Sequence, residues 1–348
     1  RFRAMEGRKV TRIAGWDTHG LPVEIETEKR LGISGKTEIE ELGIAKFNEA
    51  CRDSVFEYKE EWENLSERIG YWLDYSQPYV TFHPEYVESV WWVLKQLADR
   101  GFLYRGYKSV PYCPRCGTGL SSHEVALGYR EIEDASLHFL CPWISSDGSP
   151  DPERRAFLVW TTTPWTVPSN TGLAVHPDLS YVEVDYDGRL VVLAEERVEA
   201  VFGEDVSVKR RYEGRELAGL RYSRALDLVP IPDEPANGWT VVLENFVSSE
   251  DGTGIVHIAP AFGSDDYAAG QRHDLPMLRP IDEAGCFIEG IELVGGMFVK
   301  DADLVLAEEL KERGHLFRFG TVVHSYPHCW RCESPLLYVA RDSWFAAT

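Results

Sequence analysis

Two pairs of cysteines, each with two residues between its members, constrain the fold of this chain more than any other feature. The first pair is Cys113 and Cys116, and the second is Cys329 and Cys332. Four thiolates in two such pairs suit the tetrahedral coordination of a structural Zn²⁺ ion. Because residues 117–328, 212 in all, separate the pairs, one shared site requires the chain to fold an independent domain and return beside its starting point. The alternatives are two unrelated turns, or one degenerate site that has lost its metal.

The composition is that of a globular protein with a substantial core. The chain has 348 residues, of which 44% are hydrophobic and 27% charged, and this length predicts two or three domains. Seven cysteines are too few for a disulfide scaffold. No apolar run approaches the ~18 residues needed to span a bilayer. We therefore expect a cytoplasmic protein without a membrane partner.

The charge balance limits how the chain can bind nucleic acid. A formal net charge of −21 argues against loose, sequence-independent binding to a polyanion. It leaves room for a nucleic-acid partner that is held by a local basic face. The densest basic stretch comprises Lys209, Arg210, Arg211, Arg215, Arg221 and Arg224. A solvated surface in an acidic protein is the simpler interpretation of that stretch.

Hydrophobic periodicity predicts an α/β chain with a helical beginning and a β-rich middle. Apolar residues spaced by three or four predict one long helix over 44–72. The same spacing predicts a helix over 85–100, with Val87, Val90, Trp91, Leu94 and Leu97 facing inward. A further helix is expected over 302–314. Short β-branched runs predict strands at 157–160, 181–186, 190–194, 240–243 and 254–258, and Asp187-Gly188 predicts a hairpin between two of them.

A strip rich in threonine ends the first predicted strand of the β-rich part. Its sequence is Trp160-Thr161-Thr162-Thr163-Pro164-Trp165-Thr166. The hydroxyls of such a strip can hold an ester carbonyl, a ribose hydroxyl or an attacking water, and Pro164 removes a backbone donor at the exit. Because threonine is a good strand former, the residues alone favour an ordinary strand.

A second polar segment runs from Gly252 to Tyr267. It is a strand carrying His257 that closes in a turn rich in glycine and proline and then delivers Asp265 and Asp266. An ionised aspartate there could pair with an ammonium group or position a water. Taken singly, a histidine in a strand is more often structural, and paired aspartates before a helix are usually caps.

Together these segments resemble the class I aminoacyl-tRNA synthetases of the isoleucine, valine and leucine group. The resemblance rests on the segment from Gly15 to Glu24, the threonine strip and the Gly252–Tyr267 segment, in that order. The two segments that contain the cysteine pairs are more similar to the isoleucine enzymes than to their relatives. They run from Pro111 to Glu124 and from His324 to Cys332. The likeness runs essentially from end to end.

The resemblance implies a fold and a domain order. It implies part of a Rossmann-type catalytic domain, into which a zinc-bearing segment and a β-rich, mixed α/β, barrel-like editing domain are inserted. The expected boundaries are 1–105 for the catalytic part with its helical connection, 106–150 for the zinc segment, 151–318 for the editing domain and 319–348 for the return.

The resemblance also implies roles for individual residues. Asp17 would bind the α-ammonium of the amino acid at the synthetic site, whose pocket Gly15, Trp16 and His19 would shape. Thr161, Thr162, Thr163 and Trp165 would line the editing pocket. Asp266, the second of the two aspartates, would hold the ammonium of a misattached amino acid, and His257 would lie against the terminal adenosine or the amino acid. The four cysteines would share one zinc ion.

The implied activity is ATP-dependent esterification of tRNA(Ile) with isoleucine, with Mg²⁺ accompanying ATP, and hydrolysis of mischarged Val-tRNA(Ile). The implied protein is a cytoplasmic monomer. Neither of the family's ATP signatures, His-Ile-Gly-His and Lys-Met-Ser-Lys-Ser, occurs in the chain. We therefore expect an internal piece of a longer protein that edits but does not activate an amino acid by itself. The alternatives are a valine enzyme of the same group, a zinc-stabilised tRNA-binding scaffold without catalysis, and a free-standing deacylase.

Overall fold

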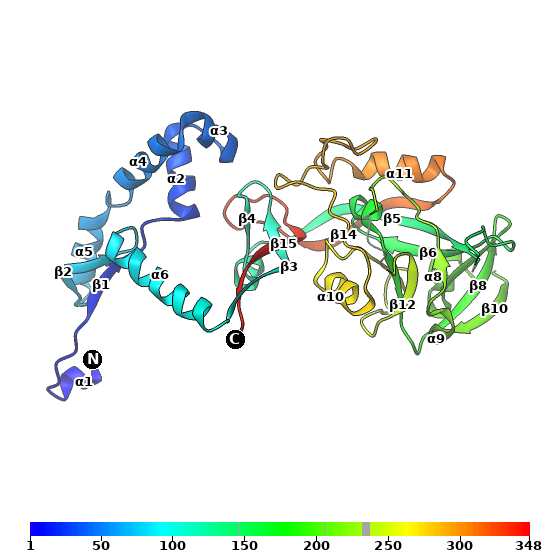
Figure 1. Cartoon of the computed structure of the whole chain (residues 1–348), viewed down its shortest axis with the longest axis horizontal. Helices are drawn as coiled ribbons and strands as arrows, with labels where there is room; N and C mark the ends of the chain where they lie inside the picture. Colours follow the sequence, from blue (N-terminus) through cyan, green and yellow to red (C-terminus); the bar gives the residue numbers. More distant parts are fainter. Residues whose placement is uncertain (146, 205, 232–236) are drawn as a thin grey trace. The chain divides into compact units, whose positions relative to one another are not determined.

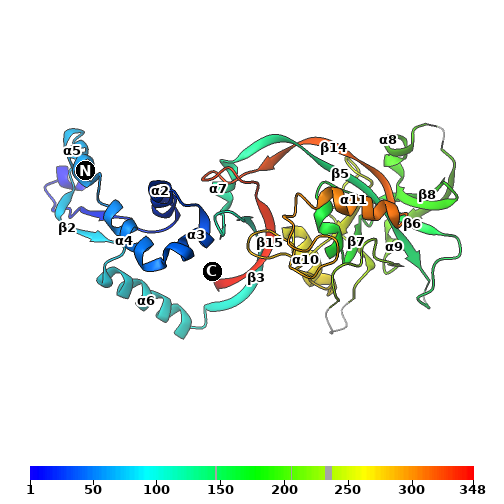
Figure 2. The ribbon, with the colours of Figure 1, turned by 90° about the horizontal axis from the view of Figure 1, so that it is seen from above.

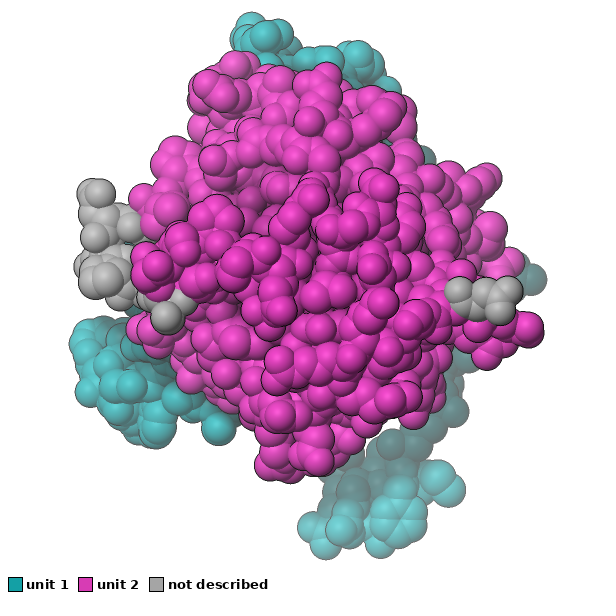
Figure 3. All heavy atoms as spheres, turned by 90° about the vertical axis from the view of Figure 1, so that its right-hand side faces the viewer, with its two compact units in different colours: residues 1–106, 343–348 teal, residues 107–342 magenta. Residues whose placement is uncertain are grey.

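The computed structural model describes residues 1–145, 147–204, 206–231 and 237–348. It divides the chain into two compact units, which Figure 3 distinguishes by colour. Residues 1–106 and 343–348 form unit 1, and residues 107–342 form unit 2. Among the described residues, no helix combines the length and the apolar character that crossing a membrane requires.

Unit 1 is mainly helical around one pair of parallel strands. Strand β1 (Ile13–Trp16) pairs with β2 (Asp74–Val80). The helices are α1 (Phe2–Met5), α2 (Leu21–Leu31), α3 (Gly35–Leu42), α4 (Ile44–Ser54), α5 (Lys59–Arg68) and α6 (Pro84–Asp99). A parallel pair whose connection consists of helices is the expected arrangement of an α/β domain.

The prediction of one long helix over 44–72 is wrong, because the structure has two helices with a turn at 55–58. At the end of α4 the hydroxyl of Ser54 donates to the carbonyl oxygen of Cys51 at 2.8 Å. Such a local bond competes with the helical ladder. Phe56, in the turn, packs against Phe82 with ring centroids 5.9 Å apart. The apolar spacing continues through the turn, so the periodicity does not reveal the break.

The helix predicted over 85–100 is confirmed as α6, but its apolar stripe does not face inward. Trp91 is 67% exposed, and Val87 and Val90 are also exposed. Only Leu94 and Leu97 of the predicted inward set are partly buried. Spacing identifies the apolar face of a helix, whereas burial depends on the elements that cover it, and none of the described elements covers this face fully.

In its described residues, unit 2 is built on a large mixed sheet of ten strands. Nine of them follow the order β10-β8-β9-β6-β5-β11-β12-β7-β13, and β14 also pairs with β5. The strand bounds are β5 (Tyr129–Ile144), β6 (Arg155–Thr161), β7 (Gly172–Val175), β8 (Ser180–Tyr186), β9 (Arg189–Ala194), β10 (Val208–Glu213), β11 (Arg221–Tyr222), β12 (Thr240–Leu243), β13 (Ile255–Ile258) and β14 (Leu316–Pro327). The pairs β6–β9 and β7–β12 are parallel, so the sheet is mixed.

Short helices accompany these strands, and a small sheet combines strands from the beginning and the end of the unit. The helices are η1 (Pro164–Ser169), η2 (Glu195–Arg197), α7 (Ser122–Ala126), α8 (Val198–Phe202), α9 (Gly214–Leu217), α10 (Ser264–His273) and α11 (Asp303–Glu312). The small sheet has the order β15-β3-β4, formed by β15 (Leu337–Ala346), β3 (Leu103–Cys113) and β4 (Thr118–Gly119). Strands β3 and β15 begin in one unit and end in the other.

The predicted strands and the hairpin of the β-rich part are confirmed. All five expected runs coincide with β6, β8, β9, β12 and β13. Asp187 and Gly188 join the antiparallel strands β8 and β9, and both have positive φ angles, of 50° and 72°. Two positive angles are what a type I′ hairpin turn requires. The helix expected over 302–314 is α11.

The strands β5 and β14 form a long antiparallel ribbon that explains how the chain leaves and returns. Tyr129 at the start of β5 pairs with Pro327 at the end of β14, and the register continues to Phe139 opposite Leu316. Figures 1 and 2 show the two strands side by side. The segment that begins just after the first cysteine pair and the segment that ends just before the second are therefore neighbours.

Candidate functional site

The four paired cysteines come together into one cluster that could hold a metal ion. Their sulfur atoms all lie within 4.8 Å of one another. The Sγ atoms of Cys113 and Cys332 are 3.4 Å apart, and those of Cys116 and Cys329 are 4.0 Å apart. A disulfide would need about 2.05 Å, so the cluster is not an oxidised pair. The prediction that the chain returns to its starting point is confirmed.

Tight turns present the sulfur atoms to the centre of the cluster. The amide of Cys116 donates to Sγ of Cys113 at 3.4 Å. In the second turn, the amide of Glu333 donates to the carbonyl oxygen of Cys329 at 2.7 Å. Burial raises the pKa of the Cys113 and Cys116 thiols, that of Cys116 to about 12. A bound cation would compensate by favouring the thiolates.

Glu124 ties the two turns together outside the cluster. Its side chain accepts from the amide of Ser121 at 2.9 Å as part of a capping box on α7. The same carboxylate forms an ion pair with Arg331 and accepts from the indole of Trp330 at 3.3 Å. A residue that follows the first cysteine pair is thus bound by two residues between the second pair.

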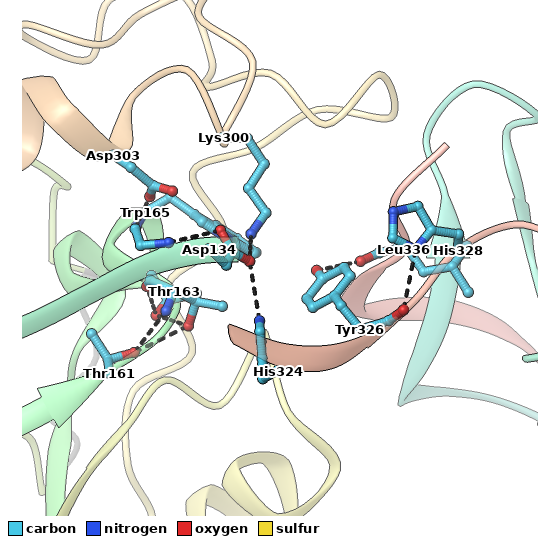
Figure 4. A network of polar contacts seen from close by, with 12 residues as sticks. Asp134, Thr161, Thr163, Trp165, Lys300, Asp303, His324, Tyr326, His328 and Leu336 are labelled. Atoms are coloured by element: carbon cyan, nitrogen blue, oxygen red, sulfur yellow. Dashed lines mark hydrogen bonds and ion pairs between the residues drawn. The ribbon is translucent and has the colours of Figure 1, made fainter. Parts of the chain in front are cut away.

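The threonine strip forms a chain of hydroxyls at the end of β6. Thr161 Oγ1 lies 3.2 Å from Thr163 Oγ1, which lies 3.2 Å from Thr166 Oγ1. The amide of Thr163 donates to Thr161 Oγ1 at 3.1 Å. Figure 4 shows Thr161 and Thr163 joined by these contacts. Thr161 is buried, whereas Thr162 and Thr163 are partly exposed. The hydroxyls are therefore prearranged by one another.

His257, on strand β13, continues this chain of hydroxyls. Its Nε2 lies 3.0 Å from Thr166 Oγ1, and its ring meets Phe139 edge-on. Nδ1 is buried with no hydrogen-bond partner among the described residues. Burial lowers the pKa of His257 to about 4, so the imidazole is neutral at neutral pH. The side chain can exchange a hydrogen bond with Thr166 without carrying a charge.

Asp266 lies in the first turn of α10, with its carboxylate held against the loop that precedes the helix. Oδ2 accepts the amide of Ala259 at 2.9 Å. A Cβ at Gly263 would lie 2.9 Å from the Asp266 Cγ, so the glycine makes room for the carboxylate. Burial raises the pKa of Asp266 to about 6. Asp265, by contrast, is exposed.

Trp165 links the strip to this loop. Its ring packs edge-on against Phe262 with centroids 4.9 Å apart. Together with the bond between Thr166 and His257, this contact brings the strip, β13 and the loop before Asp266 into one region of unit 2. The threonines, Trp165, His257 and Asp266 are the predicted residues that this region gathers.

The predicted residues of the synthetic site lie in unit 1. Gly15 and Trp16 end β1, and a Cβ at Gly15 would lie 2.1 Å from the Tyr79 ring. Asp17 and His19 are exposed, on either side of a buried Thr18 whose amide donates to Thr81 Oγ1 at 3.0 Å. His19 also lines a cavity of about 140 Å³ together with Asn48, Cys51 and Phe82.

Two residues of the region around the strip have contacts that the sequence does not predict. Thr166 belongs to the threonine strip, but its contact with His257 appears only in the structure. Asp303 accepts the amide of Trp165 at 2.9 Å from a position 138 residues further along the chain. No local pattern predicts a contact at that separation.

Comparison with known proteins gives a consistent result. The family model described as class I tRNA synthetases for I, L, M and V matches residues 1–348. The isoleucine–tRNA ligases of Clostridium acetobutylicum and Thermus thermophilus are 49% and 48% identical over 345 residues, which is 99% of this chain. The chain spans 32% of the length of each of these relatives.

Two solved structures of cytosolic leucyl-tRNA synthetase editing domains are also similar. The one from P. knowlesi is 11% identical with a TM-score of 0.42, and covers 56% of this chain and 99% of its own. The one from P. falciparum is 9% identical with a TM-score of 0.39, and covers 52% and 98%. Likenesses of this size are too weak to add to the description of the fold.

Proposed function

Because the chain belongs to the class I tRNA synthetase family of the isoleucine, leucine, methionine and valine enzymes, we propose that it is part of an isoleucine–tRNA ligase and carries the editing site of that enzyme. The whole enzyme joins isoleucine to tRNA(Ile) with ATP and Mg²⁺. The editing site hydrolyses valine from mischarged Val-tRNA(Ile). The relatives that match nearly all of the chain support isoleucine over valine as the cognate amino acid.

The observation that carries the editing proposal is the meeting of the threonine strip with His257 and the Asp266 loop. Three hydroxyls and a neutral imidazole form a continuous chain, and a carboxylate lies in the helix that follows β13. An aminoacyl ester presents an ammonium group, a carbonyl and a ribose, which are the groups that such side chains bind. The need for a second site is well established for isoleucine against valine, since one methylene in an apolar pocket discriminates only ~10–200-fold.

Asp266 would bind the ammonium group of the ester. Its Oδ2 is already engaged by the Ala259 amide, which leaves Oδ1 for an incoming cation. Burial raises the pKa of Asp266 to about 6, so the carboxylate is mainly ionised at pH 7.5. A bound ammonium would lower this pKa and favour the ionised form. Fixing the ammonium fixes the ester carbonyl relative to the strip.

The threonine hydroxyls and His257 would orient the water and the carbonyl. In the reaction, the water oxygen forms a bond to the carbonyl carbon, the bond from that carbon to the ribose oxygen breaks, and the ribose oxygen takes up a proton. His257, with a pKa near 4, is a neutral hydrogen-bonding partner for Thr166 rather than an acid. Preorganised dipoles of this kind stabilise the charge that develops on the carbonyl oxygen.

We propose Zn²⁺ as the ion of the cysteine cluster, with Cys113, Cys116, Cys329 and Cys332 as its four ligands. A tetrahedral site with Zn–S bonds of about 2.3 Å has sulfur atoms about 3.8 Å apart. The observed separations of 3.4, 3.5 and 4.0 Å surround that value. Four sulfur ligands leave no open position, so the ion would stabilise the junction at the base of the ribbon rather than take part in catalysis.

The proposal extends to the arrangement of the whole protein. Residues 1–105 would belong to the catalytic domain, 106–150 to the zinc segment, 151–318 to a barrel-like editing domain and 319–348 to the return. Asp17 would bind the ammonium of isoleucine at the synthetic site, with Gly15, Trp16 and His19 around it. We expect a cytoplasmic monomer with tRNA(Ile), isoleucine and ATP as partners.

Hydrolysis of Val-tRNA(Ile) tests the proposal, with Thr162→Arg as a steric block. Thr162 is partly exposed, and its hydroxyl is not one of the three in the chain, so we expect the fold to tolerate a larger side chain there. The parent protein should release valine, and the variant should not. A protein that instead clears Thr-tRNA(Val) would be a valine enzyme, and one that binds tRNA without hydrolysing either ester would be a scaffold.

A further inference from the structure

A buried carboxylate on α11 contacts the backbone of the threonine strip. Asp303 is 5% exposed, and its Oδ1 accepts the amide of Trp165, which is 2% exposed, at 2.9 Å. Figure 4 shows the bond reaching across from the start of α11 to the strip. A carboxylate that is buried loses its hydration, which costs free energy unless a partner compensates.

The backbone of η1 needs an acceptor that its own turn does not supply. The first amides of a helix lack intrahelical partners. Pro164 has no amide proton, and Thr163, which precedes the helix, makes no side-chain cap. The amides of Thr163 and Thr166 are bonded to Thr161 Oγ1 and to the Thr163 carbonyl. The amide of Trp165 is left over, and Asp303 accepts it.

The Trp165 peptide is connected to two parts of the candidate site, the hydroxyl chain and the loop before Asp266. Its ring packs on Phe262 in the loop before Asp266. The next residue, Thr166, donates to the Thr163 carbonyl at 2.8 Å and meets His257 at 3.0 Å. A shift of this peptide would therefore displace the hydroxyl chain and the Asp266 loop together.

Titratable groups lie near Asp303, and none of those in the described residues forms a salt bridge to it. Lys300 Nζ lies 2.5 Å from Asp134 Oδ2 on β5, and His324 Nε2 on β14 lies 3.5 Å from the same oxygen. Figure 4 shows these three residues beside Asp303 and Trp165. Lys300 is thus engaged mainly by Asp134. Asp303 remains bound to a backbone amide, as expected for a group that fixes the position of that amide.

We propose that Asp303 is a positioning residue of the editing site, which acts by holding the Trp165 amide so that the threonine hydroxyls, His257 and the Asp266 loop keep their relative places. The inference rests on the proposed editing function and assigns a role to a residue outside the pocket. Because Asp303 is 5% exposed and bound to a backbone amide, we expect it to influence the rate of hydrolysis rather than the binding of the tRNA.

Deacylation of Val-tRNA(Ile) by Asp303→Ala and Asp303→Asn tests the role. The alanine variant has no acceptor, whereas the amide oxygen of asparagine can still accept the Trp165 amide. We expect kcat to fall roughly 10- to 100-fold in Asp303→Ala with KM changed less than about twofold, since misplacement of about 1 Å has effects of that order. Asp303→Asn should keep most of the parent kcat. Asp301→Ala removes an exposed carboxylate two residues away and should change neither constant.

Amide hydrogen exchange at Trp165 provides a readout that does not depend on activity. The amide should be protected in the parent and in Asp303→Asn, and should exchange faster in Asp303→Ala. Parent-like kcat in a folded Asp303→Ala protein would overturn the inference, and so would an equal loss in the alanine and asparagine variants. If the parent itself does not hydrolyse the ester, the editing proposal fails, while unchanged exchange at Trp165 in the alanine variant would separately refute the positioning role.

Discussion

Replacing Gly128 with alanine tests how closely the ribbon must approach the second cysteine pair. A Cβ at Gly128 would lie 1.8 Å from the carbonyl oxygen of His328 and 2.9 Å from its carbonyl carbon. The amide of His328 donates to the carbonyl oxygen of Gly128 at 2.9 Å. Ordinary contacts of a Cβ begin near 3.4 Å, so the two backbones would have to separate by roughly 1.6 Å.

The cost of this separation follows from the two effects. Overpacking costs about 1–3 kcal/mol, and loss of the His328 amide bond costs about 1 kcal/mol more. Gly128→Ala should therefore lower the free energy of unfolding by about 2–4 kcal/mol. Because His328 directly precedes Cys329, the variant should also release its metal faster to a chelator. Urea unfolding and the rate of zinc release to a coloured chelator measure the two effects.

Gly320→Ala is the matched control, since Gly320 lies on β14 of the same ribbon. No atom lies within 4 Å of the Cβ position there, and its φ angle is not positive. Alanine at such a position is neutral or stabilises by about 0.4–1 kcal/mol. If the free energies of unfolding of the two variants agree within about 0.5 kcal/mol, the backbones do not approach as closely at Gly128 as the structure indicates, and the prediction is wrong.

Three further predictions concern the metal, the hydroxyl chain and a buried acid. Cys329→Ser should bind substoichiometric zinc by elemental analysis and melt at a lower temperature, whereas Cys286→Ser, outside the cluster, should do neither. Thr166→Val leaves His257 without its partner and should slow deacylation roughly tenfold. The matched Thr171→Val, which removes a buried hydroxyl with no partner among the described residues, should leave the rate unchanged. Equal rates in the two variants would contradict a role for the hydroxyl chain in deacylation. Burial raises the pKa of Asp303 to about 7, so the unfolded chain loses this proton first as pH rises from about 4 to 7 and stability falls over that window. The stability of Asp303→Asn relative to the parent should therefore rise as pH increases from about 4 to 7, by an amount on the order of a few kcal/mol; a difference that is independent of pH in urea titrations would contradict the pKa. Burial also lowers the pKa values of His257 and His138 to about 4, which makes stability rise with pH. This contribution is the same in the parent and the variant, so it cancels in the difference between their free energies of unfolding.

Much of the β-rich part could be predicted because its signals are local. Runs of β-branched residues between turns define β6, β8 and β9, and Asp187-Gly188 defines the hairpin between the last two. The convergence of the cysteine pairs was predictable for a different reason. A metal site needs ligands in sufficient number, and two pairs complete one set.

The remaining features depend on contacts that no periodicity encodes. The break between α4 and α5 lies within an unbroken apolar spacing and coincides with the bond from Ser54 to Cys51. The exposure of Trp91 depends on which elements cover α6. The role inferred for Asp303 depends on an amide left over at the start of η1, 138 residues away. A residue such as Asp303 is identified by its contact in the folded structure, whereas in the sequence it looks like an ordinary residue of a helix.

The most direct test of the proposed editing site compares hydrolysis of Val-tRNA(Ile) and Ile-tRNA(Ile) by the parent protein, Asp266→Ala and Asp265→Ala. Asp265 is the matched control, because it is the neighbouring aspartate and is exposed. We expect the parent and Asp265→Ala to release valine and spare isoleucine, and Asp266→Ala to remain folded without releasing valine. Release of valine by Asp266→Ala at the parent rate, or equal release of both amino acids by the parent, would contradict the assignment.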